Sequence, residues 1–507
     1  MAVTILSSTC KGVEGVLIRI EVDIVKGLPS FNIVGLADIS VKEAKDRVRS
    51  AIENSNYNFP LGRITVNLAP ADVRKKGSFL DLAIAIAILI ESNQIKNVEN
   101  EDFLFLGELS LNGELRNVNG ALASVIKARE EGIKKVIIPR ENLSECSHIE
   151  GIELYALDNL KEVIEFLDYN HLKAEEVEVF VAEDRNLYDF INICGQEGAK
   201  RALMICAAGG HNIVLQGPPG SGKTLLAKSL IELLPKLSFE ESLEISKIYS
   251  LKGKLDNGLI KKRPFRSPHH TITKSALIGG GRDLNLGEIS LAHNGVLFLD
   301  ELLEFDRRVI ESLREPIEVG KVNISRSIGS IEYPANFILV GAFNPCPCGN
   351  YLSGVETRKC SCSEKLRNNY ENKLSKAMKD RIDIFSFVTY VDFKELRKDK
   401  KDNINNYDYK KVIENAREIQ RRRYKDLGIS TNAKLSYDLI DKYIKITKSG
   451  EVLLENIYNK FGLSSRVLHK IIKLARTIAD IENDEIVDTS HIYEALGYRK
   501  NIRGEVI

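Results

Sequence analysis

The sequence lacks an excess of charge of either sign. Its 72 lysines and arginines are balanced by 71 aspartates and glutamates, which gives a formal net charge of +1. Bulk electrostatics therefore do not indicate a nucleic-acid partner, and any basic surface that binds one has to be local.

Long hydrophobic runs are also missing. The longest, residues 82–90, is about half of what a membrane-spanning helix requires. The first residues contain no basic region followed by an apolar stretch, which is the pattern of a signal peptide. We therefore expect a cytoplasmic protein without a membrane partner. In that compartment thiols stay reduced, which makes disulfides the weakest interpretation of the 8 cysteines.

The 507 residues are enough for roughly three domains. Strand-like and helix-like patterns alternate over residues 1–165, which predicts a mixed α/β domain containing a buried helix near residues 78–92. A charged, weakly periodic stretch at 166–188 is expected to be a linker. Residues 189–395 show a second strand–loop–helix pattern, and residues 396–507 have mostly helical patterns. The expected fold class is α/β multidomain with a helical C-terminal domain.

A phosphate-binding loop is the most specific motif. Residues 217–224, GPPGSGKT, match G-x-x-x-x-G-K-[ST] between an apolar strand and a helical segment. Backbone N–H groups of such a loop surround phosphates, so we expect ATP binding here. Lys223 is expected to reach the β- and γ-phosphates, and Thr224 to ligate Mg²⁺. The ATP-binding residues predicted are Gly217, Pro218, Pro219, Gly220, Ser221, Gly222, Lys223 and Thr224.

Two further apolar strands end in polar residues. GVLFLDEL ends in Asp300 and Glu301, and strands of open α/β sheets present their ligands at this edge. Asp300 is predicted to hold the Mg²⁺ shell, and Glu301 to orient and deprotonate the attacking water. NFILVGAFN ends in Asn344, for which spacing alone leaves two readings open: a contact to the γ-phosphate or water, or a turn before Pro345.

Several long motifs resemble the ComM/YifB family of Mg-chelatase-like AAA+ ATPases, and the resemblance covers the whole chain. They include GLPSFNIVGLADISVKEAKDRVRSAI, RPFRSPHHTITKSALIGGG, GEISLAHNGVLFLDELLEF, REPIEVGKVNISR and NPCPCG. The resemblance implies a homohexamer that binds ATP between subunits. Its members are understood as DNA helicases that drive branch migration while transforming DNA is integrated by recombination.

The resemblance also assigns three site residues. Asn344 corresponds to the sensor-1 residue, Arg381 in KDRID to the arginine finger that reaches a neighbour's γ-phosphate, and Arg466 to sensor 2. The sequence departs from the family before the finger, with LSKAMKDRID where LSGPLLDRID is usual.

Two insertions of the chelatase-like branch are similarly implied to face a central pore. The first lies between the phosphate loop and Asp300. The second is expected to be a hairpin that turns at Gly329 and Ser330. Their candidate contacts to phosphates of single-stranded or branched DNA are Lys261, Lys262, Arg263, Arg266, Lys321 and Arg326. A solvated basic surface is the alternative. For the adjacent His269 and His270, packing or pore contact is favoured over metal ligation.

The N-terminal domain resembles the Lon-protease fold, which is related to ribosomal-protein S5 folds. A peptidase of that type needs a nucleophilic serine and a lysine base. The corresponding positions hold Phe79, with Ser78 one residue away, and Leu122. We therefore expect a non-proteolytic domain. A DNA-translocating motor is favoured over a Mg-chelatase-like motor that remodels a protein or metal-insertion partner.

Four of the cysteines form two C-x-C pairs between Asn344 and Arg381. Cys346, Cys348, Cys360 and Cys362 could supply tetrahedral Zn²⁺, although the spacing within each pair is tighter than usual. Structural zinc is favoured, as a clasp on the loop, over unliganded thiols or redox regulation.

Overall fold

The computed structural model divides into two compact units, each described by itself. Unit 1 comprises residues 1–182 and 238–261, and unit 2 comprises residues 183–237 and 262–507. The residues described are 3–75, 77, 79–95, 103–169, 171–183, 188–255, 258–281, 284–326, 329–351, 359–391 and 408–500. Among them, the side chains of residues 39, 40, 42, 188, 189 and 326 are not described.

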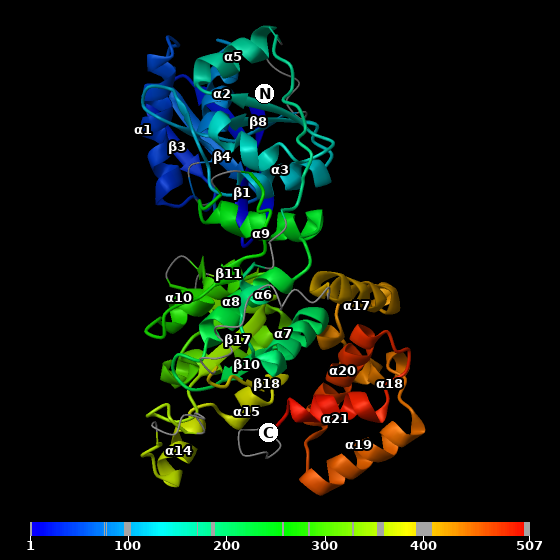
Figure 1. The fold of residues 1–507 in the computed structure, drawn as a ribbon. Coiled ribbons are helices and arrows are strands. Elements are labelled where there is room, and N and C mark those ends of the chain that lie inside the picture. The colour runs from blue at the N-terminus through cyan, green and yellow to red at the C-terminus, as the bar shows by residue number, and fades with distance from the viewer. Residues whose placement is uncertain are drawn as a thin grey trace. The chain divides into compact units, whose positions relative to one another are not determined.

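Unit 1 is built on a mixed seven-stranded sheet of order β3-β4-β2-β1-β5-β8-β9 (Figure 1). Its strands are β1 Val3–Lys11, β2 Glu14–Val25, β3 Ser30–Val34, β4 Arg63–Ala69, β5 Phe103–Phe105, β8 Lys135–Pro139 and β9 Glu153–Leu157, beside a short pair, β6 Glu108–Leu109 and β7 Leu115–Arg116. Its helices are α1 Ile39–Asn54, α2 Asp81–Glu91, α3 Ala121–Glu130, η1 Arg140–Asn142, α4 Leu143–Cys146 and α5 Leu160–Tyr169. The mixed α/β class expected from the sequence is confirmed.

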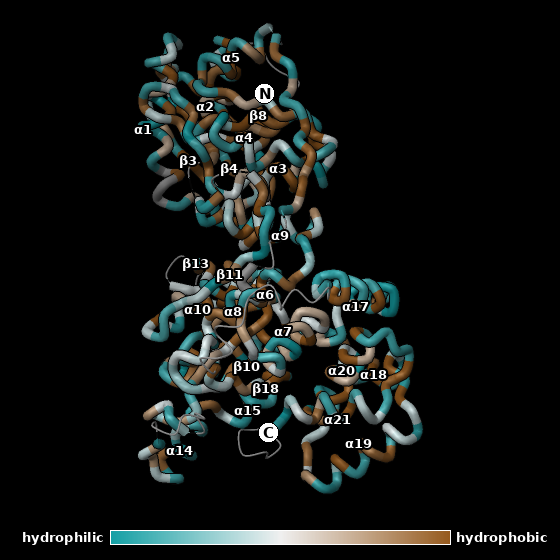
Figure 2. Tube along the Cα trace, in the orientation of Figure 1, coloured by the Kyte–Doolittle hydropathy of each residue, from teal (hydrophilic) through white to brown (hydrophobic). Residues whose placement is uncertain are grey.

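Helix α2 is buried from Asp81 to Ile90, as its all-round apolar pattern predicts. Its one charged residue within that stretch, Asp81, is paired with Arg47 at 2.6 Å, which offsets the cost of burying the carboxylate. Hydrophobic residues also gather in strand β8 (Figure 2), whose Val136–Pro139 stretch is buried. The core of unit 1 therefore lies between the sheet and its helices.

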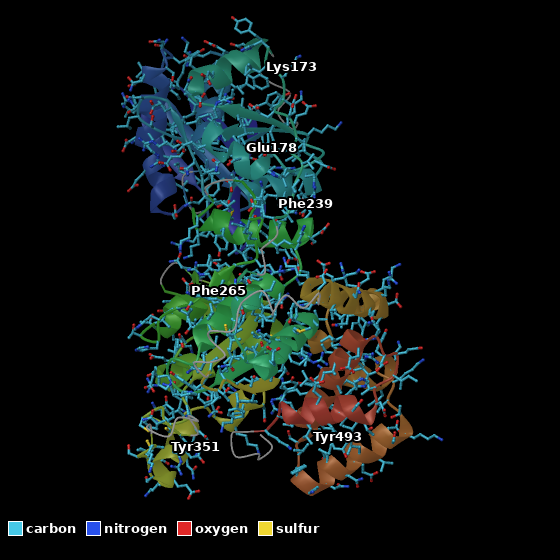
Figure 3. All side chains as sticks on the ribbon, in the orientation of Figure 1. Lys173, Glu178, Phe239, Phe265, Tyr351 and Tyr493 are labelled. Carbon is cyan, nitrogen blue, oxygen red and sulfur yellow. The ribbon has the colours of Figure 1, made fainter. Side chains whose placement is uncertain are left out.

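Helix α9, Phe239–Leu251, belongs to unit 1 although its sequence lies within the predicted nucleotide-binding domain. Phe239 packs against Phe180 with ring centroids 5.6 Å apart (Figure 3 labels Phe239). Ser250 accepts a hydrogen bond from the Gly120 backbone at 3.0 Å. The segment 238–261 thus leaves unit 2 shortly after the phosphate-loop helix and returns before the first candidate DNA-contact residues of unit 2.

Unit 2 contains a parallel five-stranded sheet of order β11-β14-β17-β10-β18. The strands are β11 Phe265–Arg266, β14 Val296–Leu299, β17 Ile338–Phe343, β10 Ile213–Gln216 and β18 Ile384–Phe387. The helices α6 Tyr188–Asn192, α7 Glu197–Gly209 and α8 Lys223–Leu233 precede or follow β10. Strands β10 and β14 are fully buried, which accounts for their continuous apolar sequences.

Short elements connect these strands. They are α10 Lys274–Ile278, β12 Gly279–Gly280, β13 Asn285–Leu286, α11 Glu288–Leu291, η2 Leu302–Glu304, α12 Arg307–Glu311, α13 Arg314–Val319, α14 Glu364–Glu371 and α15 Lys376–Lys379. The predicted hairpin is present as β15 Lys321–Arg326 and β16 Gly329–Pro334. Its predicted turn is wrong, however. Gly329 pairs with Arg326 and Ser330 with Ser325, so both lie in the second strand.

The C-terminal part of unit 2 is helical, as predicted. Its elements are α17 Tyr409–Arg423, η3 Lys425–Leu427, η4 Asn432–Lys434, η5 Tyr437–Leu439, α18 Ile440–Tyr443, α19 Lys448–Phe461, α20 Ser465–Glu482 and α21 Thr489–Gly497. Residues of α17 and α20 share one hydrophobic core with α7 and the sheet. Among the described residues, none of the helices has the length and apolarity needed to cross a membrane.

Candidate active site

Three polar segments meet at the carboxyl edge of the parallel sheet in unit 2. The phosphate loop follows β10, Asp300 follows β14, and Asn344 follows β17. Because β17 is hydrogen-bonded in parallel to both β10 and β14, all three segments emerge at the same edge. Strand order thus brings together residues that are far apart in the sequence.

The phosphate loop has the backbone that its glycines permit. Gly220 and Gly222 have φ of +77° and +91°, a region that other residues rarely adopt. A Cβ on Gly217 would lie 2.2 Å from the Val388 carbonyl oxygen, so only glycine fits there. The Ser221 hydroxyl is buried and finds no hydrogen-bond partner among the residues that the structure describes. A loop with these features fits a bound phosphate chain.

Lys223 folds back over the loop. Its Nζ donates to the carbonyls of Gly217 and Pro218 at 2.7 and 2.9 Å, and to Asn344 Oδ1 at 3.1 Å. Burial lowers the pKa of Lys223 to about 8, against the opposing charge of Asp300. The three oxygen atoms that accept from Lys223 are uncharged. A phosphate oxygen in their place would form a charge-assisted hydrogen bond with the lysine.

The predicted Mg²⁺ ligands are in contact. The Thr224 hydroxyl donates to Asp300 Oδ2 at 2.9 Å, while Asp300 Oδ1 accepts from the Glu301 backbone at 3.0 Å. A hydroxyl beside a carboxylate offers the hard oxygen ligands that Mg²⁺ takes when substrate phosphates complete its shell. The residues present therefore fit the cation.

Glu301 has a partner that the sequence did not identify. Its Oε2 lies 3.2 Å from Nδ1 of His270. The Glu301 backbone is left-handed, with φ of 51° and ψ of 45°. The sequence favours packing or pore contact for His270. It does not reveal the contact with Glu301, because that contact exists only once β11 and β14 lie side by side.

Arg381 and Arg466 are brought together, but away from the phosphate loop. Arg381 Nη2 lies 2.9 Å from Glu318 Oε2, and Arg466 Nη2 lies 3.3 Å from the other oxygen, Oε1. Arg381 also donates to the carbonyls of Arg314 and Ala377 at 3.0 and 2.7 Å. Glu318 is thus a second site residue that the sequence did not reveal.

These arginines line a charged cavity of about 350 Å³. The cavity lies at the amino ends of β10 and β18, since Asn212 and Asp383, which line it, directly precede those strands. The phosphate loop follows the other end of β10, a separation of roughly 13 Å for a strand of this length. The charged residues that line the cavity include Glu318, Arg381, Asp383, Arg466, Lys470 and Lys473.

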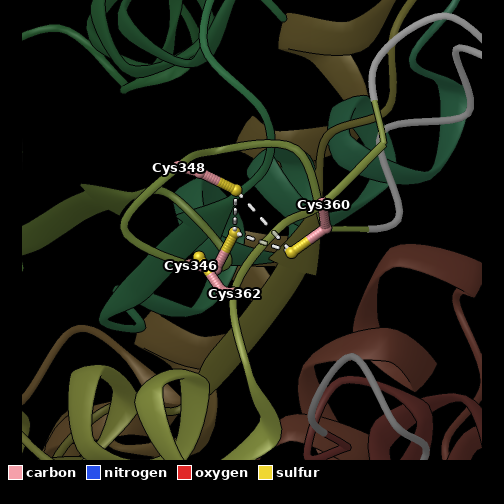
Figure 4. Close-up of side chains that lie close together, drawn as sticks. All are labelled: Cys346, Cys348, Cys360 and Cys362. Atoms are coloured by element: carbon pink, nitrogen blue, oxygen red, sulfur yellow. Dashed lines mark hydrogen bonds between the residues drawn. The ribbon is translucent and has the colours of Figure 1, made fainter.

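The four clustered cysteines converge as the C-x-C pattern suggested (Figure 4). Their sulfur atoms all lie within 4.8 Å of one another, and Cys346 Sγ is 3.4 Å from Cys348 Sγ and 3.8 Å from Cys360 Sγ. Tetrahedral zinc–thiolate bonds of about 2.3 Å place sulfurs about 3.8 Å apart, so the four residues fit zinc.

The cysteine loop contacts the phosphate loop. Gly349 has φ of +76°, and a Cβ added to it would lie 2.6 Å from the Pro219 ring. Its N–H donates to the Cys346 carbonyl at 2.9 Å, which closes the turn between the first two thiols. The cluster therefore supports both the phosphate loop and the strand end that carries Asn344.

Two of the predicted DNA-contact arginines are engaged within unit 2. Arg263 donates to the carbonyls of Pro235, Lys236 and Asn294. Arg266 makes a two-pronged pair with Glu288 at 2.7 and 3.0 Å. Both guanidinium groups thus form hydrogen bonds inside unit 2.

The other predicted DNA contacts are more accessible. Lys262 is exposed and lies 2.7 Å from Glu183, and Lys321 is exposed on the β15–β16 hairpin, 2.8 Å from Glu332. Lys261 is half-buried in unit 1. The side chain of Arg326 lies outside the described residues.

The positions that correspond to a peptidase dyad lie in the core or outside the description. Leu122 is fully buried and Phe79 is 7% exposed. Ser78 lies outside the described residues.

Comparison with known proteins shows the family to which the chain belongs. A family described as magnesium chelatase, subunit ChlI, matches residues 189–396, with related families of that subunit matching residues 20–142 and 405–499. The protein YifB of Escherichia coli is 42% identical over 489 residues, covering 96% of this chain and 95% of that protein. The competence protein ComM of Haemophilus influenzae is 40% identical over 506 residues, covering 98% and 97%. The chain belongs to the ComM/YifB family.

Membership of the ComM/YifB family makes the nucleotide-binding part of unit 2 a Mg-chelatase-like AAA+ module. A magnesium-chelatase 67 kDa subunit of Chlorobaculum parvum is 30% identical over only 170 residues, 31% of this chain and 23% of that protein. The similarity to ComM and YifB thus extends over nearly the full chain, whereas the similarity to the chelatase subunit covers only a part of it.

Proposed function

We propose that this protein is an ATP-hydrolysing motor that acts on DNA as a homohexamer and promotes branch migration during recombination or natural transformation. The observation that supports it best is the convergence of Lys223, Thr224, Asp300 and Asn344 at one edge of the sheet. We infer the DNA substrate from the similarity to a relative that is named as a competence protein.

In the proposed hydrolysis each residue has a separate task. Lys223 turns from its carbonyl partners to the β- and γ-phosphates, and Asn344 aligns the terminal phosphate or the attacking water. Thr224 and Asp300 would hold Mg²⁺, which would supply positive charge beside the phosphates. Glu301 orients the water and takes its proton.

Arg381 and Arg466 are proposed to act on a neighbouring subunit's ATP. Both lie at the amino ends of the strands, whereas the same subunit's phosphate loop follows their carboxyl ends. The contacts described for both side chains lie at this end of the sheet and include no residue of that loop. A neighbour's phosphates would compete with Glu318 for the two guanidinium groups, so hydrolysis would depend on assembly.

The accessible DNA-contact candidates are Lys262 on the first insertion and Lys321 on the hairpin. Both are exposed and paired with a single exposed carboxylate, a partner that a DNA phosphate can replace at little cost. Arg263 and Arg266 do not enter this proposal, because their bonds inside unit 2 would have to break.

The cysteine cluster is proposed to hold one structural Zn²⁺. Four thiolates close a tetrahedral site and leave no position for substrate, so the metal would stabilise the loop without taking part in hydrolysis.

A motor that remodels a protein or metal-insertion partner is the second candidate, favoured by the magnesium-chelatase family matches. The two candidates differ in what stimulates hydrolysis. A DNA motor is stimulated by DNA, whereas a chelatase-like motor is not.

The deciding experiment compares ATP hydrolysis by the full chain with forked, single-stranded and duplex DNA, and migration of a four-way junction. We expect stimulation by forked or single-stranded DNA, with Lys223→Ala inactive in both assays. Lys321→Ala should lose stimulation but keep the DNA-free rate. Arg422→Ala is the matched control, since Arg422 is also an exposed cation paired at 2.8 Å with a carboxylate, Glu418. Junction migration by Lys223→Ala at the wild-type rate would refute the motor.

A further inference from the structure

The β11–α10 connection carries a side chain to the proposed catalytic base. Arg266 of β11 pairs in parallel register with Leu297 of β14. Four residues beyond each stand His270 and Glu301, so the register itself brings the two to the same edge. At this edge His270 Nδ1 lies 3.2 Å from Glu301 Oε2.

His270 is itself held in place. Its ring lies against His269, with centroids 4.1 Å apart and planes at 33°, and edge-on to Phe305 at 6.3 Å. His269 is fixed in turn through Nδ1, which lies 2.9 Å from the Thr271 hydroxyl. The imidazole thus has a defined position on both sides.

Glu301 needs such support. Its side chain is 58% exposed and its backbone is left-handed. An exposed glutamate loses several rotamers when it is fixed for reaction. Among the described residues, His270 is the side chain for which a close approach to this carboxylate is seen, at 3.2 Å.

We propose that His270 is a positioning residue that orients Glu301 toward the attacking water. The inference rests on the proposed function, because it concerns the same hydrolytic site. His270 touches neither the phosphate loop nor the Mg²⁺ ligands in the contacts described, so it acts on turnover and not on ATP binding.

The position also connects two parts of the site. His270 lies in the first insertion, between Lys262 and α10.

The test uses full-length His270→Ala, His270→Asn and His270→Gln. Asparagine places an amide nitrogen close to the position of histidine Nδ1, the atom that faces Glu301, whereas glutamine places it near Nε2. His269→Ala removes the ring against which His270 lies but keeps His270 itself, and Glu301→Gln is the reference for loss of the base. Turnover, KM for ATP, and binding of a fluorescent ATP analogue are measured with and without forked DNA.

We expect His270→Ala to lower kcat about tenfold, on the scale of losing one fixed orientation, with KM and analogue binding within about twofold of wild type. His270→Asn should recover most of kcat and His270→Gln less, and His269→Ala, which removes only a ring contact to His270, should lose less than His270→Ala. A wild-type kcat in His270→Ala overturns the inference, as does an equal loss in His270→Asn. If Glu301→Gln itself hydrolyses ATP normally, the proposed function fails instead.

Discussion

Arg381 Nη2 lies 2.9 Å from Glu318 Oε2, and this pair stands at the opposite end of the sheet from the phosphate loop. The Arg381 side chain is 8% exposed. A group predicted to complete a neighbour's site is therefore held inside its own subunit by an internal carboxylate.

The first prediction concerns action between subunits. Arg381→Ala and Glu301→Gln should each hydrolyse ATP at least ~10³-fold more slowly than wild type, because one lacks the cation and the other the base. Mixed subunits should regain part of the activity, since some interfaces then combine an intact Arg381 with an intact Glu301. Steady-state hydrolysis across mixing ratios measures this. Absence of recovery at every ratio would place Arg381 outside the neighbour's site.

The second prediction concerns the metal. Metal analysis of the purified chain should find about one zinc per chain, as a closed four-thiolate site requires. The double variant Cys346→Ser/Cys348→Ser should lose the zinc and melt at a lower temperature, because the loop loses its cross-link. Cys194→Ser, at a cysteine outside the cluster, is the control and should keep both. A metal-free chain with full activity would contradict the assignment.

The third prediction separates loop strain from contact with the phosphate loop. Gly349→Ala should weaken ATP binding about tenfold, because its Cβ would press on Pro219, 2.6 Å away. Gly428→Ala is the matched control. Its φ of +64° imposes a similar backbone strain, costing about 1 kcal/mol, but nothing lies within 4 Å of an added Cβ. Titration with a fluorescent ATP analogue measures both. Equal affinities in the two variants would show that the cysteine loop does not support the site.

The fourth prediction concerns acid stability. His211 is buried, with Nε2 2.8 Å from the Thr477 hydroxyl, and burial lowers its pKa from 6.5 to about 4. Between pH 6.5 and 4 the unfolded chain binds a proton that the folded chain does not, so stability falls as pH falls through this window. We expect wild type to lose ~2 kcal/mol more than His211→Gln between pH 7 and 5.

Denaturant unfolding at the two pH values measures this difference. Other groups that titrate in the window, such as Asp81 with its pKa raised to about 6 by burial, are common to both proteins and cancel. The same pH dependence in both proteins would show that His211 is not the group responsible.

The sequence by itself predicted which residues gather at the nucleotide site. The motif at 217–224 and the polar ends of two apolar strands were sufficient, because parallel strands must present their carboxyl ends together. It likewise determined the C-x-C pairs as a possible tetrathiolate, since four thiols within so short a segment can meet without help from the rest of the fold. Both predictions rest on the spacing of residues within short segments of the sequence.

Only the tertiary structure decided which distant side chains meet. The pairs His270–Glu301 and Glu318–Arg381 depend on strand order and on where α13 ends, which no local pattern encodes. The packing of 238–261 into unit 1 is likewise invisible in sequence, because its apolar residues would suit either core. Local periodicity reports that a face is buried, whereas the partner that buries it is chosen by long-range packing across the whole chain.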